Sequence, residues 1–335
     1  MPMQAVNEAG GDVVAAVEAM GQALARVRAG VARVIFGQED VVEHTLITVL
    51  AGGHGLLVGL PGLAKTRLVD TLAITLGLDS KRIQFTPDLM PADILGSEVL
   101  EEGENGRRAF RFIAGPVFSQ LLMADEINRA SPRTQSALLQ AMQEGHVTVA
   151  GQRYELPQPF HVLATQNPLE QDGTYPLPEA QLDRFLMQID VPYPARLAER
   201  QMLLATTGAE QEAPIRVLTA EELRLAQRLV RRVPVGETVV EAILDLVRWA
   251  RPGEVEAEPH VARHIAWGPG PRAAQAFMLC IRARALLQGR YAPSVDDVIA
   301  LSGPILRHRM ALNFAARADG VTMDDVVQRL TQKLG

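Results

Sequence analysis

The sequence contains a single cysteine among its 335 residues. A lone cysteine cannot form a disulfide within the chain, which excludes a disulfide framework and fits a reducing compartment. Because Cys280 lies in an apolar stretch of helical pattern, we expect it to be a core residue.

The sequence also lacks an excess of positive charge and a long apolar run. With 33 basic and 39 acidic residues the net charge is -6, which excludes a general attraction to nucleic acid or anionic membranes but leaves room for a local basic channel. The most apolar stretch, Leu46 to Leu60, is interrupted by glycines and is too short to cross a bilayer. The N-terminal segment contains the acidic residues Glu8 and Asp12, whereas a secretory signal begins with basic residues followed by an apolar run. We therefore expect a cytoplasmic protein with no membrane span.

The length and the 47% hydrophobic content suffice for a sizeable core and suggest two domains. Helical spacing predicts an amphipathic helix over 12–34, and we assign 1–36 to an N-terminal helix and linker. Between 37 and 193, apolar runs alternate with helical patterns, which predicts an α/β fold: a parallel sheet with helices on both faces. After Pro192 to Pro194 the patterns are only helical, with starts at Thr219 and Ser294, so 194–335 is expected to be a small all-α domain. The five runs are 56–58, 82–85, 121–124, 161–164 and 185–189.

Two candidate β-hairpins interrupt the first domain. Apolar segments at 99–101 and 109–112 flank a glycine-containing turn at 102–106, which predicts a hairpin over about 97–113, inserted between two helical pieces. A second hairpin is predicted over about 146–157. Neither is needed to complete the sheet.

A glycine-containing loop lies between the run 56–58 and a helical stretch, the context that a phosphate-binding loop requires. Its backbone N–H groups and the helix N-terminus would face phosphate oxygens, Lys65 would reach the β- and γ-phosphates, and the Thr66 hydroxyl would bind Mg²⁺. Ala64 stands where the usual pattern has glycine, so we expect its backbone to need no positive φ. An ordinary glycine-rich turn is the alternative. The loop and the first helical residue are Gly59, Leu60, Pro61, Gly62, Leu63, Ala64, Lys65, Thr66 and Arg67.

Polar side chains end two of the later runs. Asp125 and Glu126 follow 121–124, at a sheet edge where α/β proteins hold ligands. Asp125 would bind Mg²⁺, and Glu126 would orient and polarise the attacking water. Asn167, after the next run, could bind both the γ-phosphate and the water. An exposed acidic pair and a turn asparagine are the alternatives, but the combination predicts ATP hydrolysis.

Two arginines stand at positions without an evident structural role. Arg184 precedes the last run and has no evident carboxylate on its own helix face, so it could act on a neighbour's phosphate. A solvated arginine, or one paired with Asp183, is the alternative. Arg272 lies in the first turn of a helix, where the helix dipole does not favour a cation. A functional role and simple solvation are both open for it.

Other polar clusters are assigned no function. His260 and His264 have metal-site spacing, but Val261 replaces the glutamate of a zinc hydrolase, and we expect surface histidines. The basic clusters 231–232 and 307–309 are expected to be solvated faces or intersubunit contacts.

The order and context of these motifs closely resemble the MoxR family of AAA+ ATPases, in the group that carries an insert in helix 2 and includes the magnesium chelatase motor subunit. The resemblance runs from about Val34 to Leu334 and is most specific at 59–66, 85–96, 124–130 and 177–185. Alanine at position 64 is itself usual in this family. The resemblance implies a P-loop NTPase core with an α-helical lid domain, and a hexameric ring with Mg-ATP at each subunit interface.

The resemblance also implies a role for each motif. Lys65 and Thr66 match Walker A, Asp125 and Glu126 match Walker B, Asn167 matches sensor 1, Arg184 the arginine finger and Arg272 sensor 2. Gly37 and Gln38 match the stretch near the adenine. Arg129 also follows Walker B closely, so it competes with Arg184 for the finger role. Partners that contain a von Willebrand factor A domain, and help with metal cofactor insertion, are implied as well.

The leading hypothesis is therefore a chaperone-like ATPase that remodels a protein client. A nucleic-acid motor is the alternative, because inserted hairpins also occur in helicase rings, but it would need basic residues lining a channel. The first hairpin instead carries Glu101, Glu102 and Glu104 towards its tip, with Arg107 and Arg108 only on the return arm. That distribution favours a protein client. A nucleotide-bound scaffold without turnover conflicts with the presence of both Glu126 and Arg184.

Overall fold

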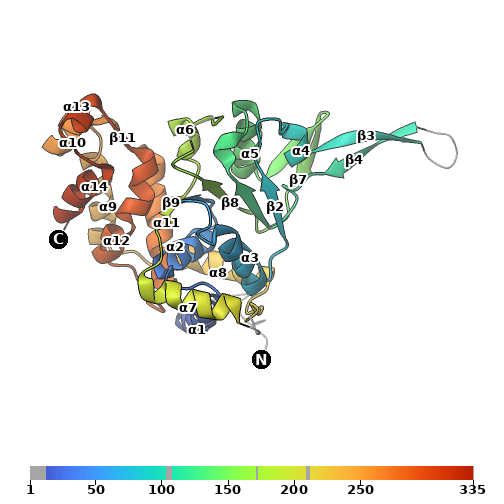
Figure 1. Ribbon diagram of the computed structural model, residues 1–335. Coiled ribbons are helices and arrows are strands. Elements are labelled where there is room, and N and C mark those ends of the chain that lie inside the picture. Colours follow the sequence, from blue (N-terminus) through green and yellow to red (C-terminus); the bar gives the residue numbers. More distant parts are fainter. Residues whose placement is uncertain (1–12, 103–107, 171–172, 209–211, 335) are drawn as a thin grey trace.

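The computed structural model describes residues 13–102, 108–170, 173–208 and 212–334. Its centre is a five-stranded sheet of order β2-β5-β8-β1-β9, in which every neighbouring pair is parallel (Figure 1). Each strand coincides with or overlaps one of the five apolar runs, so the predicted parallel sheet is confirmed. The strands are β1 (Gly55–Val58), β2 (Ser80–Gln84), β5 (Leu121–Asp125), β8 (His161–Gln166) and β9 (Met187–Asp190).

Helices cover both faces of this sheet because alternate residues of the strands point to opposite sides. Leu57 and Met123 belong to the apolar cluster that includes α1 (Val13–Ala32), α2 (Glu39–Leu50) and α3 (Lys65–Leu76). Their chain neighbours, Leu56 and Leu122, belong to the second cluster, with α4 (Pro91–Leu95) and α5 (Pro132–Glu144). The layered α/β architecture follows from these two clusters.

The strands β3 (Gly96–Glu102) and β4 (Arg108–Ala114) form an antiparallel pair that extends away from the sheet (Figure 1). The chain enters β3 from α4, but after β4 it passes through a turn straight into β5. The expectation of helical pieces on both sides was wrong, because Gly115 and Pro116 disfavour a helix there. Most of the predicted turn, at 103–107, lies outside the described residues.

The strands β6 (His146–Val149) and β7 (Gln152–Glu155) form a second antiparallel pair. Tyr154 of this pair stacks on Phe112 of β4, with 3.9 Å between ring centroids and 18° between the ring planes. The two hairpins therefore contact each other at the base of the first.

The C-terminal part is mainly helical. Thr219 and Ser294 cap α8 and α12 through reciprocal bonds with Glu222 and Asp297, as the sequence predicted. The expectation of helices alone was wrong, since β10 (Ile265–Trp267) pairs with β11 (Ala311–Leu312). The partner strand β11 is distant in the sequence, so the local helical pattern could not reveal this pairing. The helices are α7 (Arg196–Thr207), α8 (Ala220–Arg232), α9 (Glu237–Trp249), α10 (Pro259–His264), α11 (Pro271–Leu287), α12 (Val295–Leu306), α13 (Phe314–Ala318) and α14 (Met323–Gln332).

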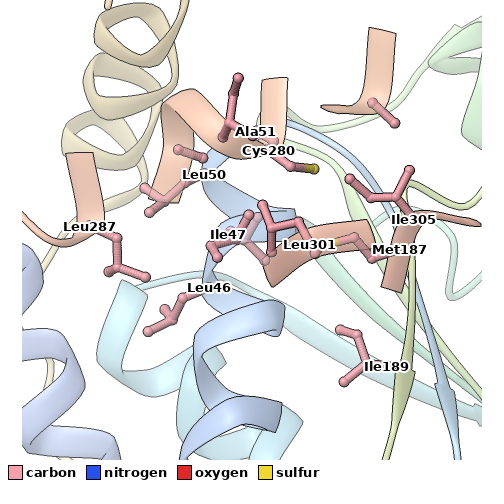
Figure 2. Packing of buried hydrophobic residues seen from close by; sticks show 14 of the residues in the cluster. Leu46, Ile47, Leu50, Ala51, Met187, Ile189, Cys280, Leu287, Leu301 and Ile305 are labelled. Atoms are coloured by element: carbon pink, nitrogen blue, oxygen red, sulfur yellow. The ribbon is translucent and has the colours of Figure 1, made fainter. Parts of the chain in front are cut away.

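This helical part packs directly on the last strand of the sheet. Figure 2 shows Met187 and Ile189 of β9 facing Leu301 and Ile305 of α12, within the same cluster as residues of α2 and α11. Cys280 of α11 lies in this cluster, as expected of a core residue, and its burial raises the pKa of the thiol to about 12. This shared apolar cluster fixes the position of β9 relative to α11 and α12. The domain boundaries at 36–37 and 193–194 stay predictions.

Within the described part of the chain, every helix is too short or too polar to cross a membrane.

Candidate nucleotide site

The loop between β1 and α3 lies at the carboxyl edge of the sheet. The Nζ of Lys65 donates to the carbonyls of Gly59 and Leu60, at 2.5 and 2.9 Å, so the loop is curled around the ammonium group. Partial burial lowers the pKa of Lys65, and the negative charges of Asp125 and Glu126 oppose that shift. The loop backbone thus lies around the ammonium group at the start of α3, a positively charged position that suits an anion such as phosphate.

The backbone of Ala64 differs from the expectation drawn from its sequence. Ala64 has φ +56 and caps the start of α3 in the left-handed region, so positive φ is required there after all. A β-carbon in this region costs about 1 kcal/mol or more relative to glycine. Since the loop must turn sharply into α3, its geometry outweighs the residue's own preference.

The Asp125 carboxylate is buried at the end of β5 and is held from both sides. Its Oδ1 accepts from the hydroxyl of Thr165, at 2.5 Å, and its Oδ2 accepts from the Arg82 guanidinium, at 2.6 Å. Both partners come from strands that neighbour β5 in the sheet. These two hydrogen bonds fix the direction of the carboxylate.

Glu126 follows directly and takes up φ +55, a second left-handed backbone at this edge. Its N–H donates to the hydroxyl of Thr165, at 2.9 Å. Its Oε2 accepts from the Gln84 amide at 2.7 Å and from Arg129 Nη1 at 3.0 Å. Arg129, at the end of the short helix η1 (Ile127–Arg129), also lies 3.6 Å from a Glu170 oxygen. In this structure Arg129 is thus bound within its own chain's site.

Asn167 follows β8, the strand that lies between β5 and β1. This order puts the residue between the two carboxylates and the phosphate-binding loop. Its Oδ1 accepts from the N–H of Leu169, at 3.2 Å, and its Nδ2 lies 3.5 Å from the carboxylate of Glu170. The residue is partly exposed.

Gly37 and Gln38 lie beside the same loop. Gln38 donates from Nε2 to the carbonyl of Leu63, at 3.2 Å, and its buried Oε1 has no hydrogen-bond partner among the described residues. Gly37 has φ +66, and a β-carbon there would lie 2.2 Å from Cβ of Ala198 on α7, so only glycine fits. A cavity of about 530 Å³ opens here, between the carboxyl end of β9 and α12. Its lining includes Gln38, His44, Asp190, Gly303 and Arg307.

Arg184 lies at the opposite edge of the sheet from this loop. It follows α6 (Glu179–Leu182) and precedes β9, and the N–H of Leu186 donates to the carbonyl of His54 just before β1. Because β1 and β9 are parallel, residues that precede them lie at the amino edge, whereas Lys65 follows β1 at the carboxyl edge. Arg184 therefore lies away from the phosphate-binding loop of its own chain.

Arg272 lies at the amino edge too, in the first turn of α11. Its Nη1 is 3.7 Å from a carboxylate oxygen of Asp183, and both arginines line a cavity of about 250 Å³. The buried Nε of Arg184 has no hydrogen-bond partner among the described residues. Asp183, the carboxylate considered for Arg184, is instead bound by Arg309 at 2.8 Å.

The cluster 307–309 differs from the expectation of a solvated face. Arg309 and His308 are buried at 2% and 4% exposure, whereas Arg231 and Arg232 are exposed as expected. Apart from the carbonyl of Ile305, the acceptors for Arg309 lie more than a hundred residues away in the sequence, 126 residues in the case of Asp183, so helical spacing alone could not reveal them.

His264 is also buried, which contradicts the expected surface position. Its Nε2 lies 3.0 Å from Asp319 Oδ2, and this contact is the main cause that lowers the pKa of Asp319. His260 is half-buried beside it. The described residues contain no group of three or more His, Cys, Asp or Glu suited to hold a metal ion.

Sequence reasoning missed three residues that hold the carboxylates, namely Arg82, Gln84 and Thr165. A signal was present for two of them, since Gln84 ends β2 and Thr165 lies near the end of β8, at the predicted carboxyl edge. The order of strands in the sheet, which puts β2 and β8 on either side of β5, was needed to recognise them.

Comparison with known proteins shows the family and the fold of this chain. Residues 54–187 match the model of the ATPase family associated with various cellular activities (AAA), and residues 257–330 match the AAA lid domain. A crystal structure of a candidate ATPase from Cytophaga hutchinsonii superposes with a TM-score of 0.86 and 35% identity, covering 95% of this chain and 96% of that one.

Curated relatives cover most of the chain. The chaperone MoxR1 of Mycobacterium tuberculosis is 41% identical over 302 residues, which are 90% of this chain and 79% of the relative. The protein MoxR of Paracoccus denitrificans is 33% identical over 296 residues, 84% of this chain and 86% of the relative. The chain therefore belongs to the MoxR family of AAA+ ATPases.

Proposed function

We propose that the protein hydrolyses Mg-ATP at the interfaces of a homo-oligomeric ring and uses the energy to remodel or activate a protein client. One observation carries the proposal: Lys65 and Glu126 lie at one edge of the sheet, and Arg184 lies at the other edge of the same chain. Arg184 can assist hydrolysis only in a neighbouring copy. Such a contact joins two different surfaces, and contacts of this kind generate a ring when the rotation between successive copies closes.

The phosphate groups would be held by Lys65, by the N–H groups of 59–66 and by the start of α3. The oxygen donors of Thr66 and Asp125 fit Mg²⁺, a hard cation that prefers such ligands and usually needs only one or two from the protein. When bound with ATP, Mg²⁺ would supply positive charge to the phosphate oxygens. Gly37 and Gln38, with the adjoining cavity of about 530 Å³, would receive the adenine.

Glu126 and Asn167 would orient the attacking water. Glu126 accepts hydrogen bonds from Gln84 and Arg129, which fix the carboxylate at the carboxyl edge. Arg184 and Arg272 of the adjacent copy would stabilise the charge that develops on the transferred phosphate. Arg129 would then remain with Glu126 in its own site, which assigns the finger role to Arg184.

A protein client is supported by the charge of the β3–β4 hairpin. Arg111 pairs with Glu101 at 3.0 Å and Arg108 pairs with Glu102 at 3.4 Å, so these arginines are already neutralised. A nucleic-acid motor would need free positive charge here. The chaperone name of the relative from M. tuberculosis points the same way. We propose a hexamer in the cytoplasm, a partner with a von Willebrand factor A domain, and a role in metal cofactor insertion.

The experiment that tests this function mixes two inactive variants. Lys65→Ala lacks a working phosphate loop, and Arg184→Ala lacks the finger. By random mixing of equal amounts, about one interface in four pairs an intact loop with an intact finger. ATPase activity should therefore return in co-assembled rings. If rings that contain both variants stay inactive, the shared site is wrong.

A further inference from the structure

Arg309 makes more polar contacts than its position in a basic cluster suggested. The guanidinium has five N–H donors, and all of them meet an acceptor in the 183–186 segment or in α12. The acceptors are Asp183 Oδ1 (2.8 Å from Nε), the carbonyls of Ile305 (2.6 Å) and Leu186 (3.2 Å) from Nη1, and the carbonyls of Phe185 (2.7 Å) and Asp183 (3.4 Å) from Nη2.

The segment bound by Arg309 is the one that carries Arg184. Next to Arg309, in the short helix η2 (Arg307–Arg309), the ring Nε2 of His308 lies 3.0 Å from the carbonyl of Phe185. The backbone on either side of Arg184 is thus tied to η2, at the end of α12. Among the described residues, Arg184 Nε has no partner of its own. The direction of the Arg184 side chain therefore depends on backbone that Arg309 fixes.

Arg309 also competes with Arg272 for the carboxylate of Asp183. Asp183 stands between Arg309 at 2.8 Å and Arg272 at 3.7 Å. The nearer, buried arginine neutralises the carboxylate, so the exposed guanidinium of Arg272 is only weakly held. Without Arg309, the full charge of Asp183 would draw Arg272 towards itself and away from a neighbouring subunit.

We propose that Arg309 is a positioning residue for the reaction in the neighbouring subunit, because it fixes the segment of Arg184 and leaves Arg272 free. This rests on the proposed function, in which Arg184 acts across the interface. Arg309 is buried at 2% exposure, so its contribution acts through the half-buried Arg184 and the exposed Arg272. A displacement of about 1 Å at such a site can cost on the order of 10²-fold in rate.

The test determines whether an Arg309 variant impairs the active site of its own chain or that of the neighbouring subunit. Arg309→Met keeps the length of the side chain but loses the charge and all five donors. It should bind ATP normally and hydrolyse it roughly 10²-fold more slowly. Mixed with Lys65→Ala, it should regain activity, because its own phosphate loop is intact. Mixed with Arg184→Ala, it should regain none, because both variants lack a working finger.

The reverse pattern, in which Arg309→Met restores Arg184→Ala, would mean that Arg309 serves its own chain's site and would overturn the inference. If Lys65→Ala and Arg184→Ala fail to restore each other, the proposed function fails first and the two failures are distinguished. Should Arg309→Met not fold, Arg309→Lys takes its place, since it keeps the charge opposite Asp183. A folded Arg309→Lys that restores neither partner would also overturn the inference.

Arg284→Met is the matched control. Arg284 pairs with Asp297 at 2.6 Å and with Glu43 at 3.1 Å, so its loss also removes a partly buried ion pair from α11, but it has no contact with 183–186. It should lower thermal stability and leave the ATPase rate of the folded ring unchanged. If both variants lost the same ATPase rate, the effect of Arg309→Met would be explained by lower stability and not by positioning of Arg184 and Arg272.

Discussion

The side-chain amide of Gln84 donates to the carboxylate of Glu126, with 2.7 Å between Nε2 and Oε2. Gln84 ends β2 and Glu126 follows β5, and these strands are neighbours in the sheet. Arg129 donates to the same oxygen. The direction of Glu126 is therefore set by groups other than the phosphate-binding loop. Changing the charge of Glu126 should leave that loop undisturbed.

Glu126→Gln should consequently separate binding from hydrolysis. Glutamine can still accept from Gln84 and Arg129 through its carbonyl oxygen, but it cannot polarise water as a carboxylate does. The ATPase rate should fall about 10²-fold or more, while ATP affinity stays near that of the unchanged protein. Lys65→Ala, measured beside it, should lose binding. An equal loss of ATP binding in both variants would contradict the role given to Glu126.

Ala64→Gly should stabilise the protein. The left-handed backbone at Ala64 strains its β-carbon, and glycine relieves this at some cost in unfolded-state entropy, for a net gain of roughly 0.5–1 kcal/mol. Urea unfolding without nucleotide measures the gain. Ala150→Gly is the control, since Ala150 has φ +48 in the turn of the second hairpin, remote from the loop by sequence. Destabilisation by Ala64→Gly alone would show that the methyl group packs favourably.

The sheet could be predicted from the sequence because its central strands, β1, β5 and β8, are short, mostly buried apolar runs whose pattern is visible locally. The loop 59–66 and the carboxylates Asp125 and Glu126 could be predicted because each directly follows one of these runs, so their pattern is also local in the sequence. The role of Arg309 could not be predicted, since all its acceptors but Ile305 lie in a distant segment and its sequence neighbours suggested a surface position. The φ of Ala64 was mispredicted because tertiary geometry outweighed residue preference. The contact of Asp183 with Arg309 and Arg272 likewise needed the three-dimensional structure.

Two histidines, the half-buried His54 and the buried His161, connect segments at the amino edge of the sheet in their neutral form. His54 accepts the N–H of Val162 at Nδ1, which leaves Nε2 to donate to Met142. His161 accepts from Gln227 at Nε2, which leaves Nδ1 to donate to Gly53. Burial lowers the pKa of His54 to about 3 and the pKa of His161 to about 4. Protonation of either ring would break an accepting bond inside the core.

Stability should therefore decrease on acidification. Both folded pKa values lie below the unfolded value of about 6.5, so the unfolded chain takes up protons first as the pH falls. The contribution is fully present above about pH 6.5 and is lost towards pH 4, at up to roughly 1.4 kcal/mol per pH unit for each histidine. Urea unfolding at pH 7 and about 5.5 measures the slope. His161→Gln should give a shallower slope, and an unchanged slope would refute the assignment.

The β3–β4 hairpin presents apolar side chains to solvent beyond its base. Phe110 is 71% exposed, and Leu100, its partner across the strands, is 49% exposed. At the base, by contrast, Phe112 stacks on Tyr154 and meets Phe118 edge to face. The outer part therefore contributes little to the core. Exposed apolar residues of this kind are typical of a contact surface.

Replacing 98–111 with a short Gly-Ser turn should therefore spare the fold and remove the response to a client. Phe112 and its ring contacts remain, so thermal stability and ATP binding should stay near normal. The hairpin continues from α4 and leads into β5, which ends at Asp125, so a rearrangement at the phosphates can reach it through rigid elements. Stimulation of hydrolysis by a client should be abolished. Leu100→Ser with Phe110→Ser, which keeps the backbone of the hairpin, should reproduce that loss if the apolar pair makes the contact.

Under the opposite interpretation the hairpin packs between subunits, and its removal would lower the mass of the oligomer and the basal ATPase rate together. Size measurement with ATP, run beside the activity assay, separates the two, and a dissociated ring would refute a role in client contact.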